Sequence, residues 1–176
     1  THRHTLFPYT TLFRSPAPRV LIGGLGMGFT LRAALDAAPA DARIEVVEIA
    51  PAIVEWNRGP LAPLAGRPLD DPRVSVHVGD VGERIGQGGP WDAILLDTDN
   101  GPGAVMIAAN AALYSSEGLM AARRALAPGG VLALWSADRS SAFEALMAGA
   151  GLDWRVVETP AAAGRPDPLH ALYFIR

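Results

Sequence analysis

Short apolar runs alternate along this chain with segments whose apolar residues recur every three or four positions. Seven of the runs predict strands, at residues 19–22, 44–48, 73–78, 91–96, 131–135, 154–158 and 171–175. The segments between them predict helices at 30–35, after Pro51, after Asp80, from a cap at Ser116 through Leu126, and from Ser140 or Ser141 through Leu146. Strands that alternate with helices indicate a parallel, doubly wound sheet, which binds ligands at the carboxyl ends of its strands.

Three of these apolar runs say more about how the strands of this α/β fold are arranged. The run at 91–96 is almost continuously apolar, as expected of a central strand covered on both faces. The last two runs are separated by a loop rich in proline and glycine, with no helical segment between them. We therefore expect a mostly parallel seven-stranded sheet that ends in an antiparallel hairpin.

A glycine-rich turn, Gly23-Gly24-Leu25-Gly26-Met27-Gly28, follows the first predicted strand, and the second predicted strand ends in Glu48. Glycines allow a strand to turn into a helix with its backbone close to a ligand. A carboxylate at the end of the next strand can accept hydrogen bonds from both ribose hydroxyls. Together the two features predict a nucleoside site, whereas the alternative for Glu48 is a solvated acid near the start of the helix at Pro51.

The spacing of the glycines narrows the choice of nucleoside. A dinucleotide fingerprint beginning at Gly24 would need glycine where Phe29 stands, so NAD is disfavoured. A phosphate-binding loop needs a lysine, and the chain has none. The remaining spacing, G-x-G-x-G, is that of class I S-adenosylmethionine-dependent methyltransferases; the alternative is a glycine-rich turn that binds nothing.

Two further acids, Asp80 and Asp97, stand where the third and fourth strands end. Asp80 is placed to accept from an adenine amine, and it can equally cap the next short helix. Asp97 follows the most apolar strand, where a partly buried carboxylate could hold a cationic amine or take a proton from it.

Candidates for binding the acceptor substrate are Asp99 and Asn100, in the loop after the fourth strand, and Tyr114. For Asp99 and Asn100 the alternative is an Asx-turn that starts the loop, and for Tyr114 it is core packing. Met27 and Phe29 are expected either to floor the pocket or to pack the first helix.

Composition bounds these interpretations. The chain has 176 residues, of which 49% are hydrophobic, which suits a single domain with a core. The net charge is −3 without a block of like charge, so neither nucleic acid nor an anionic membrane is expected as partner. Cysteine is absent and the four histidines lack metal-ligand spacing, so no metal is expected. No apolar run approaches the roughly 18–20 residues of a membrane span, and we expect a cytoplasmic protein.

Residues 1–15 differ from the rest of the chain in the kind of sequence they contain. Residues 5–15, TLFPYTTLFRS, resemble translated sequencing-adapter DNA, so residues 1–15 are interpreted as a non-native leader, with a native disordered arm as the alternative. Residues 16–176 are then expected to form one nucleoside-binding domain.

Five stretches, VLIGGLGMGFTLRAAL, VVEIAPAIVEW, DDPRVSVHVGD, WDAILLDTDNGPG and ARRALAPGGVLALWSA, resemble the spermidine synthase-like (polyamine aminopropyltransferase-like) branch of the class I methyltransferase superfamily. The resemblance implies a Rossmann-like methyltransferase fold and a transferase that uses S-adenosylmethionine or its decarboxylated form as co-substrate. It implies that Asp97 is catalytic, that Glu48 binds ribose and that Asp80 meets adenine. The full set of implied co-substrate contacts is Gly23, Gly24, Leu25, Gly26, Glu48, Ile49, Asp80, Val81 and Asp97.

The chain also departs from the family pattern. Family members resemble G-G-G-D-G-G in the first loop and D-S-S-D-P after the fourth strand, whereas Met27 and Asn100 stand at or near those two aspartates. Both differences remove acidic partners for a polycation. We also expect the chain to lack the family's amino-terminal β-hairpin domain, either cut off at the leader or never present. The family likeness still makes aminopropyl transfer to a small-molecule amine the first expectation, with methyl transfer to another acceptor and a non-catalytic nucleoside-binding module as alternatives. A homodimer is left open.

Overall fold

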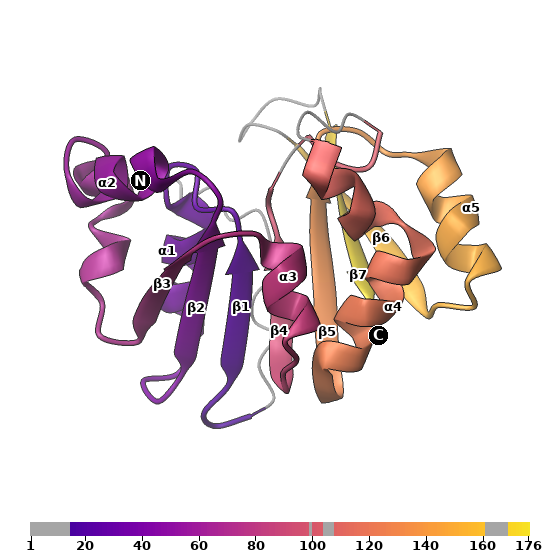
Figure 1. Ribbon diagram of the computed structural model, residues 1–176, viewed down its shortest axis with the longest axis horizontal. Coiled ribbons are helices and arrows are strands. Elements are labelled where there is room, and N and C mark those ends of the chain that lie inside the picture. Colours follow the sequence, from indigo (N-terminus) through magenta and orange to yellow (C-terminus); the bar gives the residue numbers. More distant parts are fainter. Residues whose placement is uncertain (1–14, 99, 104–107, 161–168) are drawn as a thin grey trace.

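The computed structural model describes residues 15–98, 100–103, 108–160 and 169–176 (Figure 1). Its centre is a seven-stranded sheet in the order β3-β2-β1-β4-β5-β7-β6. The strands are β1 (Arg19–Gly23), β2 (Arg43–Glu48), β3 (Val74–Val78), β4 (Trp91–Leu96), β5 (Leu126–Ser136), β6 (Trp154–Pro160) and β7 (Leu169–Ile175). Neighbouring strands among the first five of this order, β3, β2, β1, β4 and β5, pair in parallel. Strand β7 pairs antiparallel with both β5 and β6. The predicted mixed sheet with a closing hairpin is thus confirmed.

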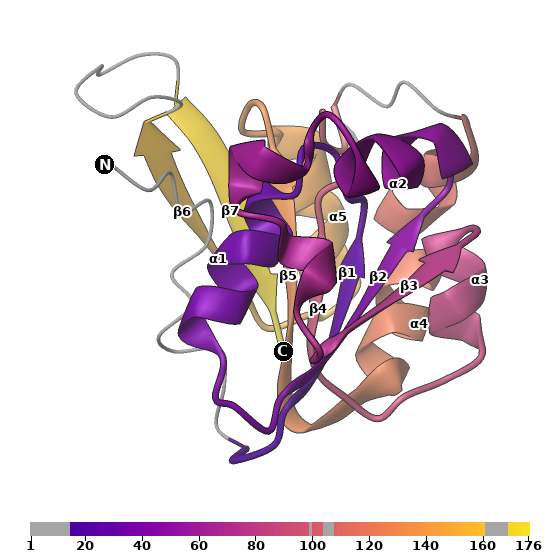
Figure 2. The same ribbon diagram turned by 90° about the vertical axis from the view of Figure 1, so that its left-hand side faces the viewer.

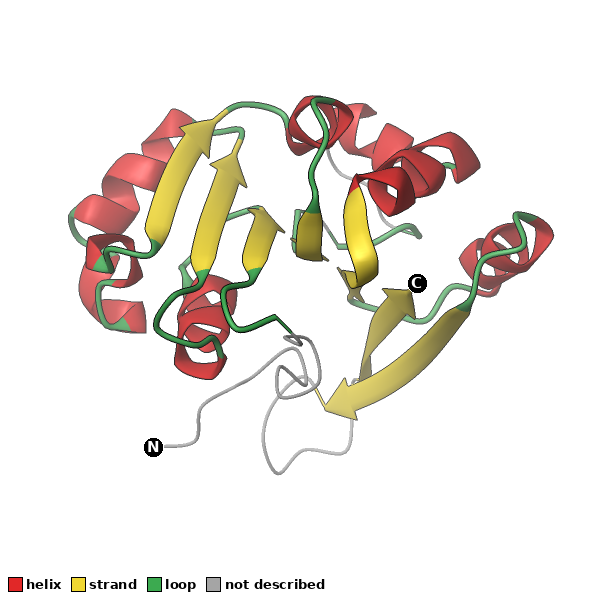
Figure 3. Cartoon of the chain, turned by 90° about the horizontal axis from the view of Figure 1, so that it is seen from below, coloured by secondary structure: helices red, strands yellow, loops and turns green. Residues whose placement is uncertain are grey.

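Helices cover both faces of this sheet, as Figures 2 and 3 show. They are α1 (Phe29–Ala37), α2 (Pro51–Arg58), α3 (Val81–Gly86), α4 (Ser116–Ala125) and α5 (Ser141–Gly149), with short 3₁₀ helices η2 (Ala62–Ala65), η3 (Pro68–Asp70) and η4 (Ala108–Tyr114). One apolar cluster joins α1 and α2 to one face, and another joins α3, α4 and α5 to the other. Because side chains alternate between the faces of a strand, β1 and β4 contribute to both clusters.

Burial explains why β1 and β4 occupy the middle. Residues 20–23 of β1 are buried, and so is β4 apart from Asp92. The outer strand β3 is mostly exposed, in keeping with its place at an edge of the sheet. The pattern of the sequence therefore located the sheet's centre as well as its strands.

Two predicted boundaries were wrong. Helix α4 is capped by Ser115, whose hydroxyl accepts from the Gly118 amide, so Ser116 is already helical. Strand β5 begins at Leu126, before the turn-forming residues 128–130 that were expected to precede it. The reason is a register shift, because Trp91 pairs with Leu126 and the regular ladder resumes only at Val131. Within the described residues, the helices are too short or too polar to cross a membrane.

Candidate functional site at the carboxyl ends of the strands

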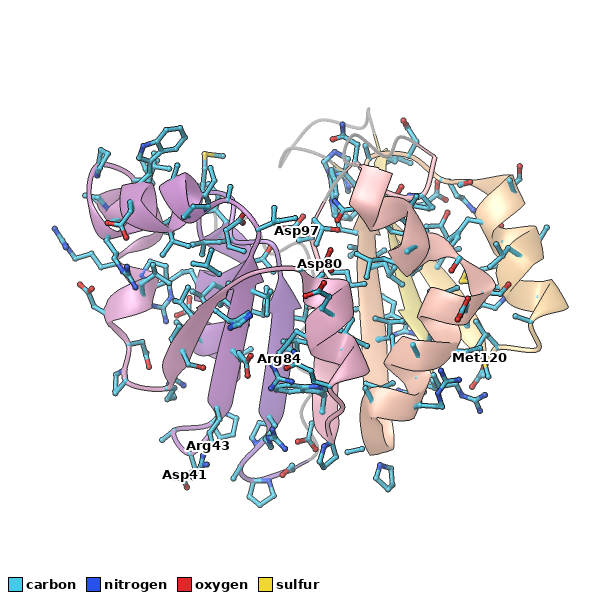
Figure 4. The ribbon with its side chains drawn as sticks, viewed as in Figure 1. Asp41, Arg43, Asp80, Arg84, Asp97 and Met120 are labelled. Carbon is cyan, nitrogen blue, oxygen red and sulfur yellow. The ribbon has the colours of Figure 1, made fainter. Side chains whose placement is uncertain are left out.

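A cavity of about 280 Å³ opens where β1, β2, β3 and β4 end. Figure 4 shows Asp80 and Asp97 at this end of the sheet. The lining residues are Gly24, Gly26, Val47, Glu48, Ile49, Ala50, Ile53, Gly79, Asp80, Val81, Asp97, Thr98 and Asn110. Among them are three carboxylates and no basic side chain. The cavity therefore favours a ligand with positive charge.

The glycine turn forms one wall. Gly24 has φ +88°, and a Cβ there would collide with the backbone carbonyl of Asp97. Gly26 has φ +50°, and a Cβ there would meet no atom within 4 Å, so its backbone faces open space. The turn thus brings bare backbone to the cavity, as the sequence predicted. Gly23 and Leu25 also belong to this turn, but they are not among the residues that line the cavity.

Glu48 is 8% exposed at the end of β2 and holds two backbone segments together. Its Oε2 accepts from the Leu25 amide at 2.8 Å, and its Oε1 accepts from the Ala50 amide at 2.9 Å. A carboxylate has about four lone-pair sites, so each oxygen retains capacity for a further donor. Glu48 can therefore hold the glycine turn and still accept hydrogen bonds from a ligand that enters the cavity.

Asp80 likewise has a structural role. It caps α3, and its Oδ1 accepts from the Gly82 amide at 2.6 Å and the Glu83 amide at 3.3 Å. Both donors use the same oxygen, so among the described residues no hydrogen bond involves Oδ2. The cap foreseen as an alternative is present, and it leaves one oxygen for a ligand.

Asp97 follows β4, and its Oδ2 accepts from the Thr30 hydroxyl at 2.6 Å. Burial raises the pKa of the Asp97 carboxyl, while the hydrogen bond from Thr30 and the charge of His170 act in the opposite direction. His170 lies on β7, and its Nδ1 accepts from the indole N–H of Trp135 on the neighbouring strand β5 at 3.2 Å. A carboxylate with a raised pKa is suited to exchange a proton with a ligand.

The remaining candidates lie elsewhere. Asn100 is exposed, and its carbonyl accepts from the Ala137 amide at 3.0 Å. Tyr114 is buried, packs edge-on against Phe143 at 6.1 Å between ring centroids, and has its hydroxyl 3.4 Å from Thr98 Oγ1. Neither lines the cavity. Asp99 lies outside the described residues.

Met27 and Phe29 do not floor the pocket. Both are exposed and absent from its lining. Ile49 and Val81, in contrast, line the cavity, and their contact with a co-substrate stays a prediction.

Sequence reasoning missed Thr98 and Asn110. Asn110 is buried on η4, and its Nδ2 donates to the Thr98 carbonyl at 3.4 Å. The only signal was a polar residue within an alanine-rich stretch, which does not by itself indicate a site. Within the described residues, no group of three or more histidine, aspartate or glutamate side chains could hold a metal ion.

Comparison with known proteins gives the chain a family context. No protein-family model matches the sequence. Over 153 residues the chain is 32% identical to a protein named polyamine aminopropyltransferase from Mycobacterium tuberculosis, covering 84% of this chain and 27% of that protein. A protein of the same name from Corynebacterium efficiens is 33% identical over 168 residues, covering 93% of this chain and 30% of that protein. The chain thus spans less than a third of the length of these relatives.

Solved structures agree on the fold. Spermidine synthase from Thermotoga maritima matches with a TM-score of 0.73 and 23% identity, over 94% of this chain and 56% of that one. Human methyltransferase-like protein 13, solved in complex with SAH, matches with a TM-score of 0.67 and 23% identity, over 96% of this chain and 78% of that one. The chain is thus similar in sequence to proteins named polyamine aminopropyltransferase, and it has the fold seen in spermidine synthase and in methyltransferases.

Proposed function

We propose that this chain is the nucleoside-binding part of an aminopropyltransferase that takes decarboxylated S-adenosylmethionine as donor and a small amine as acceptor. The observation that carries the proposal is the meeting of Glu48, Asp80 and Asp97 around one cavity, beside the bare backbone of Gly24 and Gly26. The similarity to polyamine aminopropyltransferases supports the reaction type.

Each carboxylate has a distinct task in this proposal. Glu48 accepts from the ribose hydroxyls, using the lone pairs that its two backbone donors leave. Asp80 accepts from the adenine amine through Oδ2. The negative cavity favours the sulfonium of the donor and, in a diamine acceptor, the ammonium at the end that does not react.

The reaction is a displacement at carbon. The neutral amine nitrogen attacks the methylene carbon next to the sulfonium, a C–N bond forms, and the C–S bond breaks with its electron pair moving to sulfur, so methylthioadenosine leaves as a neutral thioether. The attacking amine loses one proton, which Asp97 accepts and then releases to water. Holding both reactants in line supplies most of the rate, because the protein forms no covalent bond to either.

Methyl transfer from S-adenosylmethionine itself is the second candidate, and one observation favours it. Helix α1 starts at the glycine turn without a side-chain cap and without an acidic residue in its first turn. The backbone amides of its first turn could donate to the carboxylate that S-adenosylmethionine has and the decarboxylated form lacks.

Titration calorimetry separates these candidates. We expect decarboxylated S-adenosylmethionine and methylthioadenosine to bind, and Glu48→Gln to weaken both roughly 10- to 100-fold, since a hydrogen bond to a charged group is worth about 1.5–3 kcal/mol. Asp97→Asn should keep methylthioadenosine affinity and abolish transfer to putrescine. Tighter binding of the carboxylated form together with methyl transfer would favour the second candidate. If no adenosyl compound binds, both are wrong.

A further inference from the structure

Thr30 lies in the first turn of α1, directly behind the glycine turn, and its side chain is directed at Asp97. The residue is 4% exposed, and its hydroxyl donates to Asp97 Oδ2 at 2.6 Å. This distance is typical of a hydroxyl bound to an ionised carboxylate, which is among the stronger hydrogen bonds in proteins. The contact joins α1 to the end of β4 across 67 positions of the sequence.

The two oxygens of Asp97 are therefore not equivalent. Oδ2 is held by Thr30, and within the described part of the chain no hydrogen bond involves Oδ1. A carboxylate with one oxygen fixed cannot turn about its Cβ–Cγ bond without breaking the hydrogen bond from Thr30. The other oxygen thus keeps a single direction beside the cavity that Asp97 lines.

We propose that Thr30 is a positioning residue. Its hydroxyl fixes the Asp97 carboxylate so that Oδ1 is the atom that accepts the proton of the attacking amine. This inference rests on the function proposed above. Thr30 makes no contact with the reacting atoms in this scheme and acts only through Asp97.

The electrostatic surroundings give the inference a measurable consequence. Burial raises the pKa of Asp97, and Thr30 and His170 lower it. The other charged side chains that line the cavity, Glu48 and Asp80, are both acidic. Removing the Thr30 hydroxyl therefore leaves burial opposed by His170 alone, so the pKa of Asp97 should rise and the ionised fraction should fall.

The test compares Thr30→Val and Thr30→Ala, which remove the donor, with Thr30→Ser, which retains it. Ser75→Ala, on the exposed edge strand β3, is the control for loss of a hydroxyl. The carboxyl titration of Asp97 is followed by carbon-13 NMR in the ligand-free protein, with the resonance assigned through Asp97→Asn. The pH profile of kcat/KM is measured with decarboxylated S-adenosylmethionine and putrescine.

We expect both donor-free variants to raise the pKa of Asp97, to move the acidic limb of the profile to higher pH, and to lower kcat roughly 10- to 100-fold with little change in KM for the donor. Thr30→Ser and Ser75→Ala should resemble the parent. Two donor-free variants are used so that a folding defect in one leaves the other to decide.

Three results would contradict this scheme in different ways. An unchanged Asp97 titration in a folded donor-free variant, with an active parent, would overturn the role of Thr30 alone. Equal losses in Thr30→Ser and Thr30→Val would assign the effect to packing and would also overturn it. A shifted titration in a protein that shows no transfer would instead overturn the proposed function, and the assignment of Oδ1 to the amine would be lost with it.

Discussion

Replacing Glu48 by glutamine tests whether this side chain holds the site together. The substitution keeps the shape of the side chain but turns one accepting oxygen into an NH₂ group. Each carboxylate oxygen now accepts from one backbone amide, that of Leu25 or that of Ala50. In Glu48→Gln, one of these amides must therefore face another donor.

The expected loss in the free energy of unfolding follows from the burial of Leu25. Leu25 is 4% exposed, so water cannot readily replace the lost partner of its amide. Losing one hydrogen bond to a charged group costs about 1.5–3 kcal/mol, and an orphaned buried amide adds a penalty of similar size. We expect the free energy of unfolding to fall by about 2 kcal/mol or more. In a domain of this size each kcal/mol corresponds to about 2–4 °C, so Tm should fall by at least roughly 4–8 °C.

Thermal and urea unfolding of the ligand-free protein measure this effect without reference to any activity. Glu55→Gln is the matched control, because the Glu55 side chain is 67% exposed and, among the described residues, forms an ion pair only with Arg58 on the surface of α2. Its effect should stay within about 0.5 kcal/mol. If Glu48→Gln unfolds at the same temperature as Glu55→Gln, the two backbone bonds do not support the turn and our account of Glu48 is wrong.

Two further predictions concern the surroundings of the site, and a third concerns an ion pair at the start of β3. Gly24→Ala should lower the free energy of unfolding by more than about 1 kcal/mol, since it combines a positive φ with a backbone collision, whereas Gly103→Ala, where a Cβ meets nothing within 4 Å, should be nearly neutral in the same urea titration. Asn57→Ala should lower adenosyl affinity and stability by about 1–2 kcal/mol each, measured by calorimetry and urea unfolding, because the buried amide donates to the carbonyl of Gly26 at 2.8 Å. The guanidinium of Arg73 lowers the pKa of Asp71 to about 2 from 3.8, so this pair should contribute stability above pH 3.8 that is lost as the pH falls toward 2; urea unfolding of Asp71→Asn should lack that part of the pH dependence.

The sequence predicted the strands well, and it predicted that the acids at their ends would meet at one edge of the sheet, because both follow from local pattern. Apolar runs bounded by turn residues identify strands, and parallel strands bring their carboxyl ends to one edge. The acids at 48, 80 and 97 could therefore be assigned to one place without knowing the packing. The start of β5 could not be predicted, because its pairing with β4 shifts register where Pro128 and two glycines would ordinarily mark a turn.

The partners of the site residues were not predictable, because they depend on how elements far apart in sequence pack. Nothing in the sequence links Thr30 to Asp97, and the contact exists because α1 packs against β1 and β4 with its first turn at the end of the sheet. The contact between His170 and Trp135 was not predictable for the same reason. The strand of His170, β7, is added antiparallel beside β5, which places the imidazole against Trp135 and near enough to Asp97 to affect its pKa.

A structural role and a ligand-binding role were weighed against each other for the acids in the sequence, and the structure makes that opposition unnecessary. Glu48 gives one hydrogen bond per oxygen to the backbone, and Asp80 places both of its backbone bonds on Oδ1. In each case the fold consumes only part of the accepting capacity of the carboxylate. A ligand would therefore meet acids that are already immobilised by the chain, which lowers the entropic cost of binding. It also follows that loss of binding in a variant at either position is informative only beside its measured stability, since the same atoms hold the turn, the helix and the ligand.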